Sequence, residues 1–215
     1  MAKPDINKCS SILCVEGRSD LDFMAEMLES VGRGPVFIKQ FNGWADLRQQ
    51  LYVFLSPELL ATKAAIGVVV DADTSPAGRF KGFQDALKEI TGKEVPSSGM
   101  WAGTKPSIGL LVVPDMTTGG ELETLVWRSW SGDSQNDQVT RCILAYEECL
   151  KQSKVVPRSA DKARIGALLA FRNDDDPRLG PGARSRVFDL FSPVLADLRR
   201  FLEGFPEGVP WSVES

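Results

Sequence analysis

The chain has 215 residues, of which 43% are hydrophobic and 25% charged, and its formal net charge is −4. These are ordinary values for a globular protein that buries a core without disulfide or metal staples. The chain contains no histidine, which excludes Ser-His-Asp and Cys-His catalysis and zinc sites of the H-E-x-x-H type. Any catalysis must use carboxylates, Lys, Arg, Ser, Tyr or a metal ion held by oxygen ligands.

The sequence carries no signal for membrane insertion. No apolar run approaches the roughly 20 residues that a membrane helix needs, and the first residues lack the apolar stretch of a signal peptide. We therefore expect a cytoplasmic protein with no membrane partner. The cysteines, Cys9, Cys14, Cys142 and Cys149, form no C-x-x-C pair, which predicts reduced, buried thiols.

Charge is distributed unevenly along the chain. Residues 1–153 hold 15 basic and 20 acidic side chains, whereas residues 154–200 hold 10 basic and 6 acidic ones. A basic segment on an acidic body permits a local anion-binding face. A solvated helix surface is the alternative that the composition leaves open.

The first part of the chain alternates apolar runs with helical patterns. Residues 11–15 predict a strand, and a tight loop then leads into a helix for which Ser19 is a natural N-cap. Residues 35–39 predict a second strand. A helix that starts near Trp44 follows, and Pro57 breaks or restarts it.

Two runs predict strands that are covered on both faces. Residues 66–70 (IGVVV) and residues 108–113 (IGLLVV) are apolar without alternation. Between them we expect a loop over residues 74–78, a helix that carries residues 80–90, and irregular structure over residues 96–106.

Beyond a turn at residues 117–120 the patterns are helical only. They predict helices over about 121–130, 136–152, 160–171 and 184–203, with a loop over 173–182. The alternation of strands and helices predicts an α/β fold with a mostly parallel sheet flanked by helices. We expect a single domain over residues 1–215, with an α/β core over about 8–133 and a helical C-terminal extension over about 134–205.

Acidic residues follow three of the predicted strands. Glu16 follows the first strand, Asp71 and Asp73 follow the third, and Asp115 follows the fourth. Parallel strands share one carboxyl edge, where ligands bind. Carboxylates that gather there raise each other's pKa, and Mg²⁺ or Mn²⁺ relieves the repulsion. The pattern predicts a divalent-metal site, although a capping or turn aspartate is an equal alternative for Asp71 taken alone.

Two of these motifs carry a resemblance to a known family. Residues 13–20 (LCVEGRSD) resemble the first motif of Toprim domains, and residues 68–73 (VVVDAD) resemble their D-x-D motif. Toprim domains occur in primases, topoisomerases, recombination proteins and the overcoming-lysogenization-defect nucleases. The resemblance implies a Toprim or Rossmann-like sheet with an acidic metal site.

More narrowly, most of residues 11–203 resembles a small Toprim-related family of unknown function. That family shows V-E-G, V-D-A-D, P-D, G-x-L-E, K-A-x-I and L-A in this order, and the later four correspond here to residues 114–115, 120–123, 162–165 and 169–170. Phe171 stands where that family usually has an aromatic residue, often Trp. The family has no settled activity, so the resemblance implies the fold and the acidic site more firmly than the reaction.

The resemblance implies a role for each acid. Glu16 would be a metal ligand or the general base, and Asp71 and Asp73 would hold Mg²⁺. Asp20 would support a second metal ion, and Glu123 falls on the acid of the G-x-L-E motif and joins the expected metal ligands.

Two functions remain open at this point. The first is a Mg²⁺- or Mn²⁺-dependent, nuclease-like enzyme that processes phosphodiesters of nucleic acid, with Lys162 stabilising charge on the phosphate. An exposed helix lysine is the alternative for Lys162. The second function is a non-catalytic module that binds metal together with a nucleotide or nucleic acid and works with a partner ATPase, since the chain has no P-loop.

Overall fold

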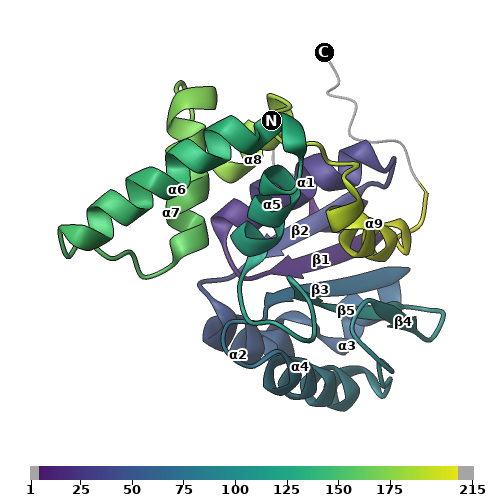
Figure 1. Ribbon diagram of the computed structural model, residues 1–215. Coiled ribbons are helices and arrows are strands. Elements are labelled where there is room, and N and C mark those ends of the chain that lie inside the picture. Colours follow the sequence, from purple (N-terminus) through teal and green to yellow (C-terminus); the bar gives the residue numbers. More distant parts are fainter. Residues whose placement is uncertain (1–4, 208–215) are drawn as a thin grey trace.

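A single five-stranded sheet forms the centre of the molecule in a computed structural model that describes residues 5–207 (Figure 1). The strands are β1 (Ser11–Val15), β2 (Val36–Gln40), β3 (Ala65–Asp71), β4 (Met100–Ala102) and β5 (Ser107–Val113), in the order β2-β1-β3-β5-β4. All neighbours are parallel except β4 and β5, which are antiparallel. The predicted α/β fold with a mostly parallel sheet is confirmed.

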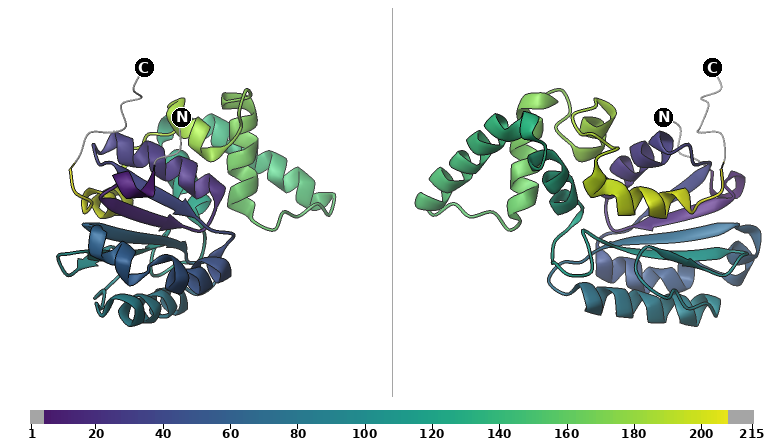
Figure 2. Two further views of the ribbon diagram at one scale, coloured as in Figure 1. Left: turned by 180° about the vertical axis from the view of Figure 1, so that it is seen from behind. Right: turned by 45° about the vertical axis from the view of Figure 1, so that its right-hand side comes forward.

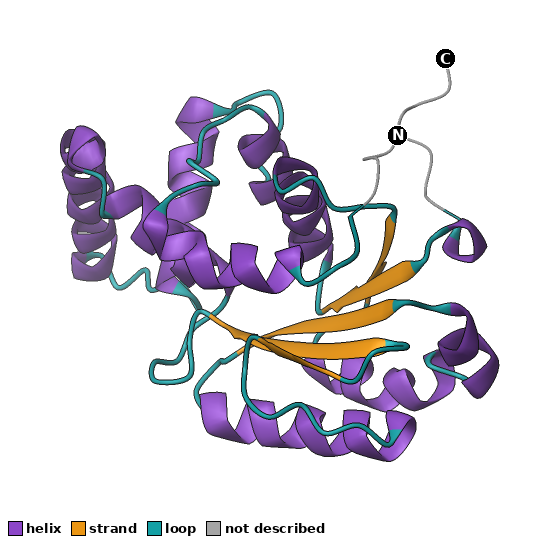
Figure 3. Ribbon diagram, turned by 90° about the vertical axis from the view of Figure 1, so that its right-hand side faces the viewer, coloured by secondary structure: helices purple, strands orange, loops and turns teal. Residues whose placement is uncertain are grey.

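Helices cover both faces of this sheet. Figure 3 shows the orange strands between layers of purple helices. One face carries α2 (Trp44–Phe54), α3 (Pro57–Thr62) and α4 (Pro76–Thr91), and the other carries α1 (Arg18–Ser30), α5 (Leu122–Ser131) and α9 (Ala196–Glu203). Because β1, β3 and β5 are covered on both sides, their runs are apolar without alternation.

The remaining helices form two groups. α6 (Asp137–Gln152) and α7 (Ala160–Arg172) project from the body of the molecule, as the views in Figure 2 show. α8 (Leu179–Arg184) instead packs closely against α1. Gly180 makes this packing possible, because a Cβ atom there would collide with Asp22. The C-terminal segment therefore shares its core with the sheet through α8 and α9.

Two helix starts differ from the expectation. α1 is not capped by Ser19. Its N-cap is Gly17, whose N–H donates to the carboxylate of Asp20 at 2.9 Å. α4 begins at Pro76, within the predicted loop, because Ser75 accepts a hydrogen bond at the helix start and proline fits the first turn of a helix.

Two other segments also differ. The sequence predicts irregular structure over residues 96–106, but β4 forms there because its backbone pairs with β5 at the edge of the sheet. The helix predicted over residues 184–203 is broken. α8 already ends at Arg184, a 3₁₀ turn starts at Pro193, and only then does α9 begin. Proline lacks an N–H group and cannot continue a helix through its interior.

The prediction of buried thiols is correct for half of the cysteines. Cys9 and Cys14 are buried free thiols, whereas Cys142 and Cys149 are exposed free thiols. Both exposed cysteines lie on α6, which buries only Ile143 and one other side chain. Because α6 projects from the body, the face that carries them meets solvent. Over residues 5–207, no helix combines the length and apolar character that a membrane crossing requires.

Candidate functional site

Two of the predicted acids meet at the carboxyl edge of the sheet. β1 and β3 are parallel neighbours with Cys14 opposite Val68, so Glu16 and Asp71 come at adjacent strand ends. The backbone N–H of Asp71 donates to Glu16 Oε1 at 3.0 Å. Asp71 Oδ1 in turn accepts from the backbone N–H of Leu122 at 2.9 Å. These hydrogen bonds fix the two carboxylates to β3 and to the start of α5.

Burial raises the pKa of both acids. Glu16 is only 8% exposed, and the loss of hydration raises its pKa from 4.5 to about 7, although the N–H of Asp71 opposes the shift. Burial also raises the pKa of Asp71 well above its ordinary value, and the charges of Asp20, Glu16 and Glu123 raise that pKa further. The ionised carboxylates therefore destabilise one another at neutral pH, and a bound cation would relieve this repulsion.

Asp20, Glu123 and Lys162 surround this pair, from α1, α5 and α7. Burial raises the pKa of Asp20 and of Glu123, and the charge of Lys162 lowers both. Lys162 Nζ donates to Glu123 Oε2 at 3.2 Å and also to Glu121. Burial disfavours the charged form of Lys162, but Glu123 and Glu121 hold its pKa above the ordinary value. We call Glu16, Asp20, Asp71, Glu123 and Lys162 the acid group.

Glu121 is a residue that the sequence patterns do not single out. It is the N-cap of α5, and its carboxylate accepts hydrogen bonds from Lys162 and from Ser159. The only signal in the sequence is its position in the same G-x-L-E motif as Glu123. Because Glu121 and Glu123 both contact Lys162, they determine where its ammonium group lies.

Asp73 lies at the border of the acid group. Its backbone has a φ of 48° and exchanges two 2.8 Å hydrogen bonds with Gly120. Its carboxylate pairs with Arg79 of α4. The D-x-D motif thus directs Asp71 to the acid group and Asp73 to an arginine, although the charge of Asp73 still acts on the pKa of Glu16.

Asp115 has a structural environment of its own. Its carboxylate accepts hydrogen bonds from the N–H and hydroxyl groups of Thr117 and Thr118, at 2.6–2.8 Å, and from Arg128 at 2.8 Å. Burial opposes its ionisation, but these hydrogen bonds hold its pKa below the ordinary value. The carboxylate closes the turn after β5 and ties it to α5, so both of its oxygens are engaged outside the acid group.

The donor chemistry of the acid group fits a hard divalent cation, but the side chains do not form a closed coordination shell. Across the described residues, no three acidic or cysteine side chains are arranged to hold a metal ion. The reason is that Glu16 and Asp71 are turned to backbone N–H groups and Glu123 to Lys162. Carboxylate oxygens are the ligands that Mg²⁺ and Mn²⁺ prefer. Because Mg²⁺ keeps several waters and needs only one or two protein carboxylates, Asp71 and Asp20 are the residues that would hold one, next to Glu16.

A family model described as "Protein of unknown function (DUF3226)" matches residues 10–206. The chain belongs to the DUF3226 family. No curated protein and no solved structure matches the chain. The matched region runs from β1 through α9 and includes the whole acid group. Membership agrees with the expected resemblance to a family of unknown function.

Five of the ten basic side chains in the basic segment of this DUF3226 protein form ion pairs within the described residues, namely Lys162, Arg164, Arg178, Arg184 and Arg200. Arginines on the C-terminal helices contact acids of the same region or of α1, as in the pairs Arg164–Glu147 at 2.7 Å and Arg184–Glu26 at 2.6 Å. These pairs neutralise half of the positive charges of the segment.

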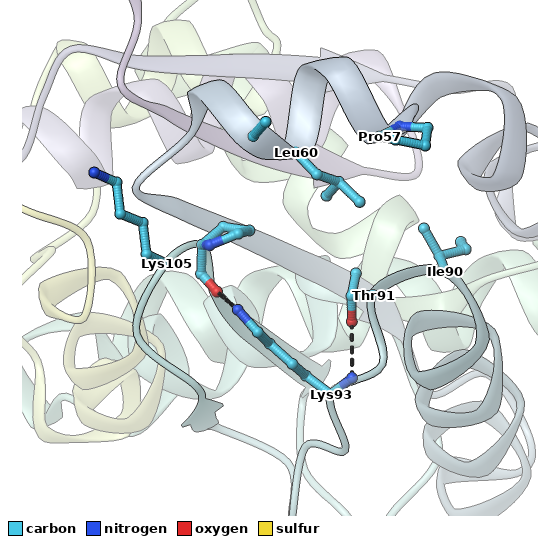
Figure 4. A pocket seen from close by; sticks show the side chains of 8 residues that line it. Pro57, Leu60, Ile90, Thr91, Lys93 and Lys105 are labelled. Atoms are coloured by element: carbon cyan, nitrogen blue, oxygen red, sulfur yellow. Dashed lines mark hydrogen bonds between the residues drawn. The ribbon is translucent and has the colours of Figure 1, made fainter.

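Two hollows open at opposite edges of the DUF3226 sheet. One, of about 330 Å³, lies at the amino edge, where Pro57, Leu60 and Ile90 line its apolar part (Figure 4). Lys93 also lines it, but its Nζ donates to the backbone carbonyl of Pro106. The other, of about 320 Å³, lies beside Asp73 at the carboxyl edge, next to the acid group.

Proposed function

We propose that this protein is a Toprim-like, metal-dependent phosphodiesterase that acts on nucleic acid at the carboxyl edge of the sheet. The observation that carries the proposal is the acid group, in which the buried Glu16 meets the half-buried Asp71 at adjacent strand ends, with the exposed Lys162 beside them. Carboxylates whose pKa is strongly raised by burial and by one another mark functional sites. When bound, Mg²⁺ or Mn²⁺ would supply Lewis-acid stabilisation of charge on the phosphate and a more acidic water.

Residues of the acid group and Glu121 would carry out the proton transfer and the stabilisation of charge. Glu16 is the proposed general base, because a pKa of about 7 suits proton transfer near neutral pH. The N–H of Asp71 orients its carboxylate. Lys162 is the fixed cation that stabilises negative charge developing on the phosphate, and Glu121 and Glu123 hold it in place.

A non-catalytic module is the second candidate. It would bind metal and a nucleotide or nucleic-acid end, and it would act with a partner ATPase. The observation that favours it is that Glu121 and Glu123 already hold the ammonium group of Lys162, the residue that the enzyme would use to stabilise charge on the phosphate. This candidate predicts binding without turnover.

A cleavage assay separates the two candidates. Purified protein is incubated with labelled single-stranded DNA, duplex DNA and RNA in Mg²⁺ or Mn²⁺, next to an identically purified Asp71→Asn variant. We expect slow cleavage that EDTA and Asp71→Asn both abolish. Equal rates in the wild type and the variant would identify a contaminating nuclease, and binding without cleavage would favour the module.

Metal ions are expected to stabilise the folded wild type through Asp71. At ten times its dissociation constant, a cation that binds only the folded state adds about 1.4 kcal/mol, or roughly 3–5 °C in the unfolding midpoint. Asp71→Asn should lose most of this rise, whereas Asp85→Asn, the same change on the exposed face of α4, should retain it. Thermal unfolding with and without Mg²⁺ measures the effect, and an equal rise in Asp71→Asn would place the ion elsewhere.

Lys162→Ala is expected to lower turnover by up to about 10²-fold and to leave most of the metal-induced stabilisation in place. Its proposed partner is the charge on the phosphate, so kcat should fall more than metal affinity does. Lys162→Arg keeps the positive charge and should recover part of the rate. If Lys162→Ala lowered metal affinity as much as it lowered the rate, Lys162 would only organise the acids and would not act on the phosphate.

A further inference from the structure

The hollow at the carboxyl edge lies between α2 and α4, directly beside the acid group. Trp44 and Arg48 of α2 line it from one side, and Arg79 of α4 lines it from the other. Asp73, two residues after Asp71 in the chain, also contributes to its wall. The charges of Arg79 and Asp73 both act on Glu16, so the hollow lies within electrostatic reach of the acid at the end of β1.

Two arginines line the hollow, and one of them, Arg48, carries a positive charge that no carboxylate within residues 5–207 balances. The guanidinium of Arg79 lies 4.1 Å from the ring centre of Trp44 and pairs with Asp73. The side chain of Arg79 is only 12% exposed and its charge is balanced by Asp73, so Arg79 shapes the wall of the hollow and does not act as a free cation. Arg48 is exposed, and its side chain has no hydrogen bond or ion pair to any residue of the described range. An unengaged guanidinium that faces a hollow suits the fork geometry of a phosphate.

On the side formed by α4, glycine residues leave part of the hollow free of side chains. Gly78 and Gly82 are four residues apart on α4, and both line the hollow. Gly82 has an ordinary helical backbone, and a Cβ atom there would meet nothing closer than the guanidinium of Arg48 at 3.9 Å. Glycine in a helix interior costs about 1 kcal/mol relative to alanine. Since neither backbone strain nor crowding requires Gly82, we attribute it to the space that it leaves in front of Arg48.

The N-terminal end of α4 adds to the positive electrostatic potential in the hollow. α4 has 16 residues, and its N-cap Ser75 and Gly78 of its first turn line the hollow. The N-terminal end of a helix carries partial positive charge and favours anions. The arginines, the open wall and the helix start thus converge on one space.

We propose that this hollow binds a phosphate group of a nucleotide chain, as a subsite next to the acid group. The inference rests on the proposed function and extends it, because it names where the substrate is held. An acidic protein needs local cations to bind a phosphate backbone, and Arg48 supplies one that is unpaired among the described residues at the edge where cleavage is proposed, because Asp73 already balances the charge of Arg79. A nucleic-acid strand and a free nucleotide both carry this phosphate chemistry.

Oligonucleotide binding tests the subsite. Anisotropy of a labelled single-stranded oligonucleotide is measured in EDTA, so that turnover does not contribute. Arg48→Ala should weaken binding about tenfold and reduce the slope of log K against log salt by about 1. Arg141→Ala removes the same charge from an exposed position on α6 and should have little effect. Equal affinities of the Arg48→Ala and Arg141→Ala variants would overturn the proposal, as would an absence of binding by the wild type.

A second pair of variants fills the hollow without removing charge. Gly82→Leu places a side chain in front of Arg48 and should weaken binding at least as much as Arg48→Ala. Gly82→Ala should leave binding nearly unchanged and raise the unfolding midpoint, because alanine favours the helix. Binding by Gly82→Leu at wild-type strength would overturn the proposal even if an Arg48 variant misfolded.

Competition identifies the source of the phosphate. Displacement of the oligonucleotide by a mononucleotide, but not by an uncharged nucleoside, supports a free nucleotide as ligand, and displacement only by longer strands supports nucleic acid. The cleavage assay on the same variants separates this inference from the proposed function. If binding depends on Arg48 but no cleavage occurs, the subsite is supported and the proposed reaction is rejected. If the Arg48 and Gly82 variants bind and cleave as the wild type does, the subsite is rejected and the proposed reaction is supported.

Discussion

Glu16→Gln is expected to lower metal-dependent phosphodiester cleavage by roughly 10²–10⁴-fold, which is the usual contribution of a general base. Glutamine keeps the size of the side chain and an oxygen that can accept the N–H of Asp71. The substitution therefore removes the negative charge and the basic oxygen while the local hydrogen bond persists. Single-turnover rates with labelled nucleic acid, in Mg²⁺ and in Mn²⁺, measure the loss.

The matched control for this experiment is Glu148→Gln. Glu148 is exposed on α6, and the substitution makes the same chemical change away from the sheet. Its rate should equal that of the wild type. A Glu16→Gln variant that cleaves at the wild-type rate would remove Glu16 from the mechanism, and with it the central part of the proposed reaction.

The same Glu16→Gln substitution is expected to stabilise the metal-free protein at pH 8. The pKa of Glu16 is raised from 4.5 to about 7 in the folded state, because burial disfavours its charge. Glu16 therefore does not destabilise the fold below about pH 4.5, and its destabilising effect grows as the pH rises to about 7. At 1.36 kcal/mol per pKa unit, the full effect is about 3 kcal/mol.

Urea unfolding in EDTA at pH 4.5 and pH 8 tests this expectation. Glu16→Gln should match the wild type at the lower pH and exceed its stability by up to about 3 kcal/mol at the higher pH, or roughly 6–12 °C in thermal unfolding. A difference that does not change with pH would show that Glu16 is not buried as an ionisable group. Added Mg²⁺ should narrow the gap, because it stabilises the ionised wild type.

These two results together would identify the acid group as a functional site that is maintained at a cost in stability. The gain in stability by itself would follow from the burial of the Glu16 carboxylate, so the simultaneous loss of turnover is the result that assigns a function. Greater stability with lost turnover is the trade-off expected where an active site gathers like charges.

Local sequence patterns determined the central strands and the positions of two site residues. β1, β3 and β5 are continuous apolar runs, because both faces of each strand are covered, and such runs are visible without knowledge of the fold. Parallel strands end at one edge, so the acids that follow β1 and β3, Glu16 and Asp71, were predicted to lie together, and they do.

Only the tertiary structure decided what the other site residues contact. A strand end fixes where a residue lies but not the direction of its side chain, so the sequence could not separate Asp71 from Asp73, which turns to Arg79. Lys162 reaches the acids because α7 packs against α5. The hollow of Trp44, Arg48 and Arg79 arises from the packing of α2 beside α4, which brings Arg79 to Trp44 and Arg48 from a distant part of the chain. Such contacts depend on distances between elements, and a local pattern in the sequence does not record those distances.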